Sequence, residues 1–246
     1  MAPWLTRRMR KWLAQAGLEL TRASVHSSAR LRLIKLLEVH RIGLVIDVGA
    51  NEGQYGSYLR EIGYRGQIVS FEPMARAHEV LAARARSDLD WKVAQRCAIG
   101  ESRRTVELQV AGNSASSSLL EMLPLHERAA PGTGTVAREE VPMLPLEIAA
   151  EPFLQTPPGK VLLKIDVQGY EPQVLAGAAS ILPRIEGLQV ELSFAELYRG
   201  QVLWLEMIDR LAGFGFECHG IDSAFSDPGT GRQLQADGLF FRTAHA

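Results

Sequence analysis

Residues 46–53 read IDVGANEG, and this stretch decides the fold expected for the 246-residue chain. It completes an apolar run, LVIDV, which is typical of a short buried strand. Gly49, Asn51 and Gly53 follow at alternate positions, and these residue types tolerate a left-handed backbone. The residues after Gly53 then open a helix, whose first turn has free backbone N–H groups. A strand, a glycine-rich turn and a helix in this order predict a nucleotide-binding sheet.

Carboxylates at two strand ends strengthen this interpretation. Glu72, in the sequence SFEP, follows the next apolar run and lies 19 residues after Gly53. A carboxylate at the tip of the second strand can accept hydrogen bonds from both hydroxyls of a ribose, and dinucleotide-binding folds use an acidic residue at about this distance. Asp47 ends the first strand, and Tyr55 lies in the first turn of the helix. We therefore expect all three side chains beside the ligand.

The turn indicates which nucleotide is bound. It lacks the G-x-G-x-x-G pattern that brings the backbone against the pyrophosphate of a dinucleotide. Its form, D-x-G-x-N-x-G, is close to the acidic glycine loop of methyltransferases that use S-adenosylmethionine, a ligand without phosphate. The alternative is that Gly49 and Gly53 only make a tight turn, which would leave Asp47 and Glu72 as coincidental carboxylates at neighbouring strand ends.

Apolar runs alternate with helical patterns along the chain, which predicts a parallel sheet with helices on both faces. The predicted strands are 44–48, 67–71, 91–99, 161–167 and 188–193. The predicted helices near them are 55–62, 75–86, 172–182 and 201–213. No helix fits between the last two apolar runs, 216–221 and 239–242, so this pair is predicted to be antiparallel.

One region departs from this alternation. Residues 105–110 predict an extra strand, and residues 111–159 are rich in Ser, Gly and Pro, with a short helical pattern near 118–129. A long irregular insert in a compact domain is usually functional or mobile.

The sequence resembles the FkbM family of S-adenosylmethionine-dependent methyltransferases. The matching stretches are VIDVGANEGQYG (45–56), GQIVSFEP (66–73), CAIG (97–100), SSSLL (116–120), LLKIDVQGYEPQVLAGA (162–178) and QVELS (189–193). The resemblance implies an α/β fold, the Rossmann-like class I methyltransferase sheet with an antiparallel last strand, continuing to about residue 242. It also implies methyl transfer, mostly to hydroxyls on sugars, polyketides or related natural products.

The resemblance further implies which residues contact the cofactor. The residues that match the family's cofactor motif are Asp47, Gly49, Asn51, Gly53 and Glu72. Ala98 and Ile99 match positions near the adenine. Many methyltransferases have an acidic residue just before that position, whereas this chain has Arg96 and Cys97 there.

The chemistry is expected at Asp166. Strand alternation puts Lys164 and Asp166 on one face, with Asp166 nearest the carboxyl edge, where the methyl group should lie. An aspartate there could act as the base, orient the methionine amino group of the cofactor or bind a divalent cation. We interpret Lys164 as an ion-pair partner.

Glu191 ends the next strand, 25 residues after Asp166. Two carboxylates that converge are costly unless a cation or a shared proton compensates. We therefore predict Asp166 and Glu191 as catalytic residues and as ligands of Mg²⁺, which prefers oxygen ligands. For Glu191 a helix cap or a solvated position is the alternative, and for Asp166 a role confined to orienting the cofactor.

For several other polar residues the sequence allows two different roles. The six histidines have no metal-ligand spacing, so no zinc site is expected. His126 is either a base that reaches the substrate or a solvated loop residue. Tyr170 and Tyr198 line the acceptor pocket or belong to the core. The serines 116–118 bind the cofactor or substrate, or cap the helix that follows.

Composition excludes several classes of protein. With 46% hydrophobic and 22% charged residues, the chain is typical of a folded globular protein. A net charge of −1 argues against a nucleic-acid partner. Cys97 and Cys218 form no CxxC motif, so we expect a reducing compartment, the cytoplasm. Neither a spanning helix nor a secretory signal is expected, because no long apolar run is present.

Residues 1–42 carry nine Lys or Arg against two acidic residues, and we expect them to be a helical extension of a methyltransferase domain over 43–246. A helix over 4–20 would separate apolar residues, Trp12 among them, from a basic cluster at residues 7–11. Its apolar face either packs on the domain as a lid over the cofactor or lies in an anionic membrane interface, at the inner face of the membrane. A lipid-linked sugar acceptor would suit the second arrangement.

The sequence therefore predicts an O-methyltransferase that acts on a hydroxyl of a sugar, a glycolipid or another secondary metabolite. A small-amine N-methyltransferase is one alternative. A nucleotide-binding module without catalysis is the other, and the carboxylates Asp47, Glu72 and Asp166 argue weakly against it. The acceptor, the position methylated and the oligomeric state do not follow from the sequence.

Overall fold

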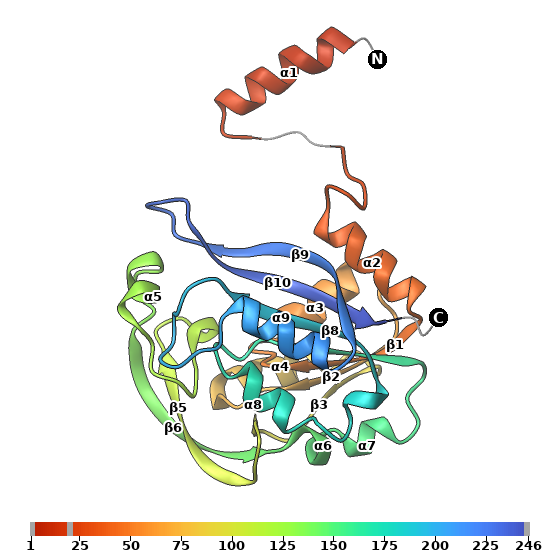
Figure 1. The fold of residues 1–246 in the computed structure, drawn as a ribbon, viewed down its shortest axis with the longest axis vertical. Coiled ribbons are helices and arrows are strands. Elements are labelled where there is room, and N and C mark those ends of the chain that lie inside the picture. The colour runs from red at the N-terminus through yellow and green to blue at the C-terminus, as the bar shows by residue number, and fades with distance from the viewer. Residues whose placement is uncertain (1–2, 19–21, 244–246) are drawn as a thin grey trace. The chain divides into compact units, whose positions relative to one another are not determined.

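The computed structural model describes residues 3–18 and 22–243, and the chain forms two compact units, residues 1–39 and 40–246. The first unit contains helices α1 (Pro3–Gln15) and α2 (Ala29–Val39) (Figure 1). Ser28 precedes α2, and its hydroxyl accepts a hydrogen bond from the backbone N–H of Leu31 (3.3 Å). This is the N-cap arrangement that serine favours.

The second unit is built on a seven-stranded sheet. Its strands are β1 (Ile42–Val48), β2 (Gln67–Phe71), β3 (Trp91–Val93), β7 (Lys160–Ile165), β8 (Ile185–Ser193), β9 (Phe216–Ser226) and β10 (Gln233–Arg242). The order is β3-β2-β1-β7-β8-β10-β9, in which β10 is antiparallel to both of its neighbours and the other pairs are parallel. The predicted class I methyltransferase sheet with an antiparallel last strand is confirmed.

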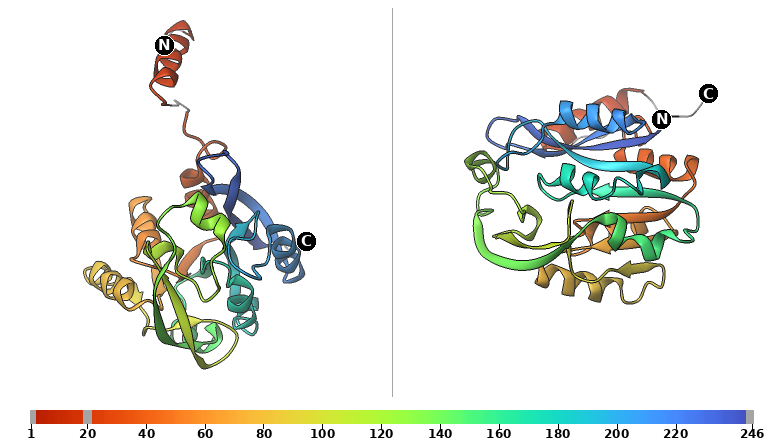
Figure 2. Two further views of the ribbon diagram at one scale, coloured as in Figure 1. Left: turned by 90° about the vertical axis from the view of Figure 1, so that its left-hand side faces the viewer. Right: turned by 60° about the horizontal axis from the view of Figure 1, so that its bottom comes forward.

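Side-chain alternation along the central strands separates the two faces of this sheet. Leu44, Ile46 and Val48 point into the main apolar core, to which helices α8 (Glu171–Ala176) and α9 (Trp204–Gly213) contribute buried side chains. Asp47 points to the other face. Figure 2 shows helices on both faces of the sheet. Helices α3 (Gln54–Glu61) and α4 (Ala75–Ala85) link the first three strands.

A second sheet corrects two predictions. The predicted strand over 91–99 is divided, because β3 ends at Val93 and β4 (Ala98–Ile99) pairs with β6 (Thr135–Leu144). Strand β6 also pairs with β5 (Arg104–Ala111), so the predicted irregular insert contains a ten-residue strand. The sequence of β6 begins TVAREE and is largely exposed there, so no apolar alternation marks it.

The remaining helices are short. They are α5 (Pro124–Ala129), α6 (Leu146–Ala149) and α7 (Glu151–Leu154), with 3₁₀ turns at Ser114–Ser116 and Leu182–Arg184. Helix α8 ends at Ala176, six residues before its predicted end, and Gly177 follows it in close contact with the carbonyl of Gly100. Of the helices in the described residues, none has the length and apolar character needed to cross a membrane.

Candidate active site

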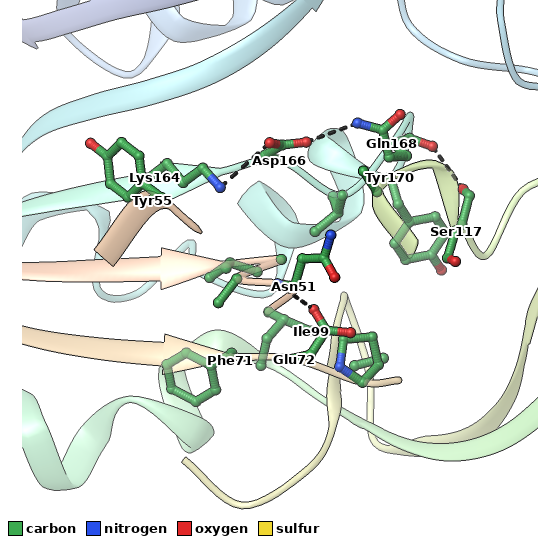
Figure 3. A pocket seen from close by; sticks show the side chains of 18 of the residues that line it. Asn51, Tyr55, Phe71, Glu72, Ile99, Ser117, Lys164, Asp166, Gln168 and Tyr170 are labelled. Carbon is green, nitrogen blue, oxygen red and sulfur yellow. Dashed lines mark hydrogen bonds and ion pairs between the residues drawn. The ribbon is translucent and has the colours of Figure 1, made fainter. Parts of the chain in front are cut away.

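A cavity of about 440 Å³ lies at the carboxyl ends of β1, β2 and β7 (Figure 3). Cavities that hold a small-molecule ligand usually measure roughly 300–1,000 Å³. The order of the strands reverses between β1 and β7, and this switch point is where α/β sheets bind ligands. The cavity has a Glu72 end, lined by Asn51, Glu72 and Ile99, and an Asp237 end, lined by Tyr55, Gln189 and Asp237.

The predicted turn after β1 borders the cavity. Gly49 and Gly53 have φ values of 81° and 85°, and Asn51 has φ of 47°. A Cβ atom at Gly49 would collide with the carbonyl oxygen of Asp166, so the turn needs glycine for space as well as for conformation. The buried side-chain oxygen of Asn51 has no hydrogen-bond partner among the described residues, so it can accept a hydrogen bond from a ligand.

Glu72 is held by backbone groups. One carboxylate oxygen accepts a hydrogen bond from the N–H of Asn51 (2.7 Å), and the other accepts one from Met74 (2.8 Å). Burial raises the pKa of Glu72 to about 7, and the two backbone hydrogen bonds oppose that shift. Each oxygen keeps a free lone pair, so the carboxylate can still accept the two hydroxyls of a ribose.

Apolar side chains form the wall beside Glu72. Ala98 and Ile99 line the cavity there, together with Phe71, Cys97 and Leu108. Such a wall suits a flat aromatic base. Arg96 turns to the carbonyl of Pro73 (3.0 Å) and to Glu139 (3.4 Å).

A row of polar residues crosses the sheet below the cavity. Asp47 of β1 pairs in register with Lys164 of β7, which pairs with Gln189 of β8. The Lys164 ammonium lies 3.1 Å from Asp47 and 3.4 Å from Asp166, as the sequence predicted for an ion-pair partner. Burial alone favours the neutral amine, but the two aspartates outweigh it and raise the pKa of Lys164.

An amide group lies between the two predicted catalytic carboxylates. The Gln168 amide donates to Asp166 (2.9 Å) and to Glu191 (3.0 Å), while its carbonyl oxygen accepts a hydrogen bond from Tyr198 (3.0 Å). Gln168 has φ of 55°, which is unusual for a residue other than glycine. Gln235 donates a second hydrogen bond to Glu191 (2.6 Å). The charges converge as predicted, and side-chain donors compensate them.

This arrangement does not fit the predicted Mg²⁺ ion. One oxygen of Asp166 and one of Glu191 already accept hydrogen bonds from amide groups, and the other Asp166 oxygen lies 3.4 Å from the Lys164 ammonium. Across the described ranges, no cluster of three or more His, Cys, Asp or Glu side chains could hold a metal ion. Glu191 lies outside the cavity lining, and burial together with Asp166 and Glu171 raises its pKa well above the ordinary value. The structure therefore favours a positioning role for Glu191.

Tyr55 lies at the Asp237 end, away from the wall predicted for the adenine. Its hydroxyl donates to the side-chain oxygen of Gln189 (2.6 Å), and the Lys164 ammonium lies 5.1 Å from the centre of its ring. In Figure 3, Tyr55 and Lys164 lie together, with Phe71, Glu72 and Ile99 on the opposite side.

The remaining candidates divide between the cavity and the core. Tyr170, Ser117 and Ser118 line the cavity, and the Ser118 hydroxyl donates to the carbonyl of Gln168 (2.7 Å). Tyr198 is fully buried and belongs to the core. His126 is buried against Ser116 (3.1 Å), so it is not a solvated loop residue, and it does not border the cavity.

Sequence reasoning missed Gln189 and Asp237. A signal was present, because Asp237 interrupts the apolar segment LQADGLFF. Whether Asp237 lies at the site depends on the register of β10 on β8, which places Asp237 opposite Glu191. The sequence does not give that register.

The profile of one family, described as the methyltransferase FkbM domain, matches residues 47–218, which is more than half of the chain. The match includes the turn after β1, Glu72, and strand β7 with Asp166 directly after it. No curated protein matches the sequence.

Solved structures resemble the chain at low identity. A putative O-methyltransferase from Klebsiella pneumoniae is 14% identical, with 99% of this chain and 91% of that chain covered and a TM-score of 0.47. TehB from Haemophilus influenzae is 9% identical, with 86% and 62% covered and a TM-score of 0.47. Fibrillarin from Aeropyrum pernix, solved with bound S-adenosylmethionine, is 12% identical, with 81% and 66% covered and a TM-score of 0.44. This chain thus spans less than two thirds of TehB.

Proposed function

Because the chain belongs to the FkbM methyltransferase domain family, we propose that it transfers a methyl group from S-adenosylmethionine to a hydroxyl of a sugar or another secondary metabolite. The family match supports methyl transfer and S-adenosylmethionine as the donor. The observation that carries the proposal is a single cavity with two chemically different ends, since a transferase must hold a donor and an acceptor together.

The Glu72 end fits the donor. We assign the ribose hydroxyls to Glu72, whose carboxylate oxygens keep free lone pairs, and the adenine to the wall that includes Ala98 and Ile99. The turn at Gly49 and Asn51 would approach the methionine part. When bound, S-adenosylmethionine supplies an electrophilic methyl group on a positively charged sulfur. The excess of carboxylates over cations in the cavity suits a ligand with that charge.

The roles of Asp47 and Asp166 follow from their exposure. Asp47 is fully buried beneath the cavity, so we propose that it acts by fixing Lys164. The Asp166 side chain is 34% exposed and lines the cavity, so it can contact the cofactor amino group.

The proposed function is tested by methyl transfer to defined atoms. The purified chain is incubated with labelled S-adenosylmethionine and with fractions of neutral and basic metabolites, and the labelled product is identified by mass spectrometry and NMR. We expect a new methyl ether. A methylated amine as the only product would favour the N-methyltransferase, and cofactor binding without any product would favour the binding module.

We also propose that α1 contacts an anionic membrane surface. Its sequence has no acidic residue, and Arg7, Arg8, Arg10 and Lys11 are exposed. Trp12 is 68% exposed and Met9 44% exposed. An amphipathic helix with these residue types binds a lipid interface, and each basic residue near it contributes about 1 kcal/mol.

A sedimentation assay with lipid vesicles separates this proposal from the lid hypothesis. The full chain should bind anionic vesicles in a salt-sensitive manner, and neutral vesicles serve as the control. The chain without residues 1–20 should lose that binding and keep its methyl transfer. Loss of activity and of thermal stability on truncation, without vesicle binding, would support the lid instead.

A further inference from the structure

The Asp237 end of the cavity is assembled from separate elements. Tyr55 comes from α3, Lys164 from β7, Gln189 from β8 and Asp237 from β10. The register of the strands puts the three strand residues on one face of the sheet, because Lys164 pairs with Gln189 and Asp237 pairs with Glu191, two residues beyond Gln189. Tyr55 belongs to the predicted cofactor stretch 45–56, whereas Gln189 and Asp237 lie outside the residues that we assign to the donor.

Side-chain contacts link Tyr55, Gln189 and Asp237. The Tyr55 hydroxyl donates to the oxygen of the Gln189 amide (2.6 Å). The amide nitrogen is then the group with which Gln189 donates to a carboxylate, and the Gln189 side chain is hydrogen-bonded to Asp237. Gln189 is nearly buried, at 9% exposure, so its side chain has little room to move.

Among the carboxylates that are not assigned to the donor, Asp237 is the one best able to take a proton. Both oxygens of Asp166 already have a partner, Gln168 on one and Lys164 on the other. Glu191 lies outside the cavity lining. Asp237 borders the cavity, and burial together with the nearby charge of Asp166 raises its pKa to about 6. A general base works best when its pKa is close to the working pH.

Resting on the proposed methyl transfer, we propose that the Asp237 end is the acceptor site, in which Asp237 accepts the proton of a neutral acceptor's hydroxyl group and Gln189 positions Asp237. The acceptor oxygen forms the new bond to the methyl carbon. The bond from sulfur to that carbon breaks and leaves its electron pair on sulfur. The hydroxyl proton passes to Asp237, so an ether and a neutral carboxylic acid result.

The surrounding charges select the acceptor class. An acceptor that carries a carboxylate or phosphate would be repelled by Asp166 and Asp237, so an uncharged hydroxyl compound is preferred. The ring of Tyr58 also lines the cavity and adds an apolar surface for such a molecule. The charged and titratable groups around Asp237 are Lys164 and Asp166 on β7, Glu191 on β8, Asp222 on β9 and Tyr55 on α3.

The test compares Asp237→Asn with Asp222→Asn. Asp222 pairs with Asp237 across β9 and β10 and lies outside the cavity lining. On a hydroxyl acceptor methylated by the native protein, we expect Asp237→Asn to lower kcat by about 10²-fold or more. The affinity for S-adenosylhomocysteine, measured by calorimetry, should stay within about threefold of the native value. A change of that size is smaller than the tenfold change that corresponds to 1.4 kcal/mol. Asp222→Asn should keep both properties.

Gln189→Leu tests the positioning role. The hydrogen bond from Gln189 lowers the pKa of Asp237, so its loss should move the acid limb of the kcat profile from near pH 6 to higher pH. An unchanged limb would contradict the role of Gln189. Full kcat in Asp237→Asn, or a loss of cofactor affinity as large as that of Glu72→Ala, would overturn the assignment of Asp237. Absence of any hydroxyl product from the native protein would refute the proposed function itself.

Discussion

The Glu72 end and the Asp237 end of the cavity are built in opposite ways. At the Glu72 end, backbone N–H groups of Asn51 and Met74 hold the carboxylate, and both donors lie in turns that follow a strand. At the Asp237 end, the partners of each polar group are side chains from other elements.

This difference has a consequence for specificity. A site made by the backbone survives most side-chain substitutions, because its donors do not depend on residue type. A site made by side chains changes with a single substitution. We therefore expect the Glu72 end to set the cofactor and the Asp237 end to set the acceptor.

The largest expected effect is the loss of folding stability in Lys164→Met, which removes the cation of the Asp237 end. Lys164 is buried between Asp47 and Asp166, so its loss leaves the fully buried Asp47 without a counter-charge. Breaking a buried ion pair costs about 3–5 kcal/mol, and we expect that decrease in the free energy of unfolding, measured with urea. The double variant Asp47→Asn, Lys164→Met should recover part of it. A decrease below about 1 kcal/mol, as for exposed ion pairs, would show that Lys164 does not compensate these charges.

The next largest effect is a loss of cofactor affinity on substitution at the Glu72 end. Glu72→Ala should weaken binding of S-adenosylhomocysteine by about 10- to 100-fold, since two charge-assisted hydrogen bonds are lost and water recovers part of their energy. Isothermal titration calorimetry measures the change, and circular dichroism confirms that the variant is folded. Unchanged affinity in a folded variant would remove Glu72 from the site.

A smaller change in affinity for S-adenosylhomocysteine is expected when the pH is lowered from 8 to 6. Burial raises the pKa of Glu72 to about 7, so the carboxylate is largely ionised at pH 8 and largely protonated at pH 6. The ionised form accepts hydroxyl hydrogen bonds more strongly, so affinity for S-adenosylhomocysteine should fall as pH falls, by up to about tenfold over this interval. Glu72→Gln should make the affinity nearly independent of pH. An equal pH dependence in that variant would assign the titration to another group.

The smallest effect, on the rate of methyl transfer, is expected from removal of divalent metal ions. The Gln168 amide compensates Asp166 and Glu191, so methyl transfer should be unchanged after dialysis against a chelator. Gln168→Glu is the matched variant, because it would place a third carboxylate where the amide lies and create a cluster of oxygen ligands. Loss of native activity in chelator, with recovery on addition of Mg²⁺, would restore the metal hypothesis.

The sequence predicted the fold and the Glu72 end because their determinants are local. The turn at Gly49 and Gly53 needs its backbone conformation wherever the chain continues, and Glu72 is placed by the strand it ends. The alternation of strands and helices likewise predicted the parallel sheet with its antiparallel last pair.

The sequence could not predict features that depend on distant pairing. Strand β6 has a polar, largely exposed first half, so only its pairing with β5 identifies it as a strand. Asp237 lies at the site only because the register of β10 on β8 places it opposite Glu191. Asp166 and Glu191 were expected to need a cation because the side chain of Gln168 was not anticipated between them.

A double-mutant cycle shows whether the Glu72 end and the Asp237 end act independently in cofactor binding. Affinity for S-adenosylhomocysteine is measured by calorimetry for the native chain, Glu72→Ala, Asp237→Asn and the double variant. We predict that Asp237→Asn binds nearly as the native chain does and that the double variant binds as Glu72→Ala does, with a coupling below about 0.5 kcal/mol, as for separate sites. A coupling above about 1 kcal/mol, or an equal loss of affinity in both single variants, would contradict the division of the cavity into a cofactor end and an acceptor end.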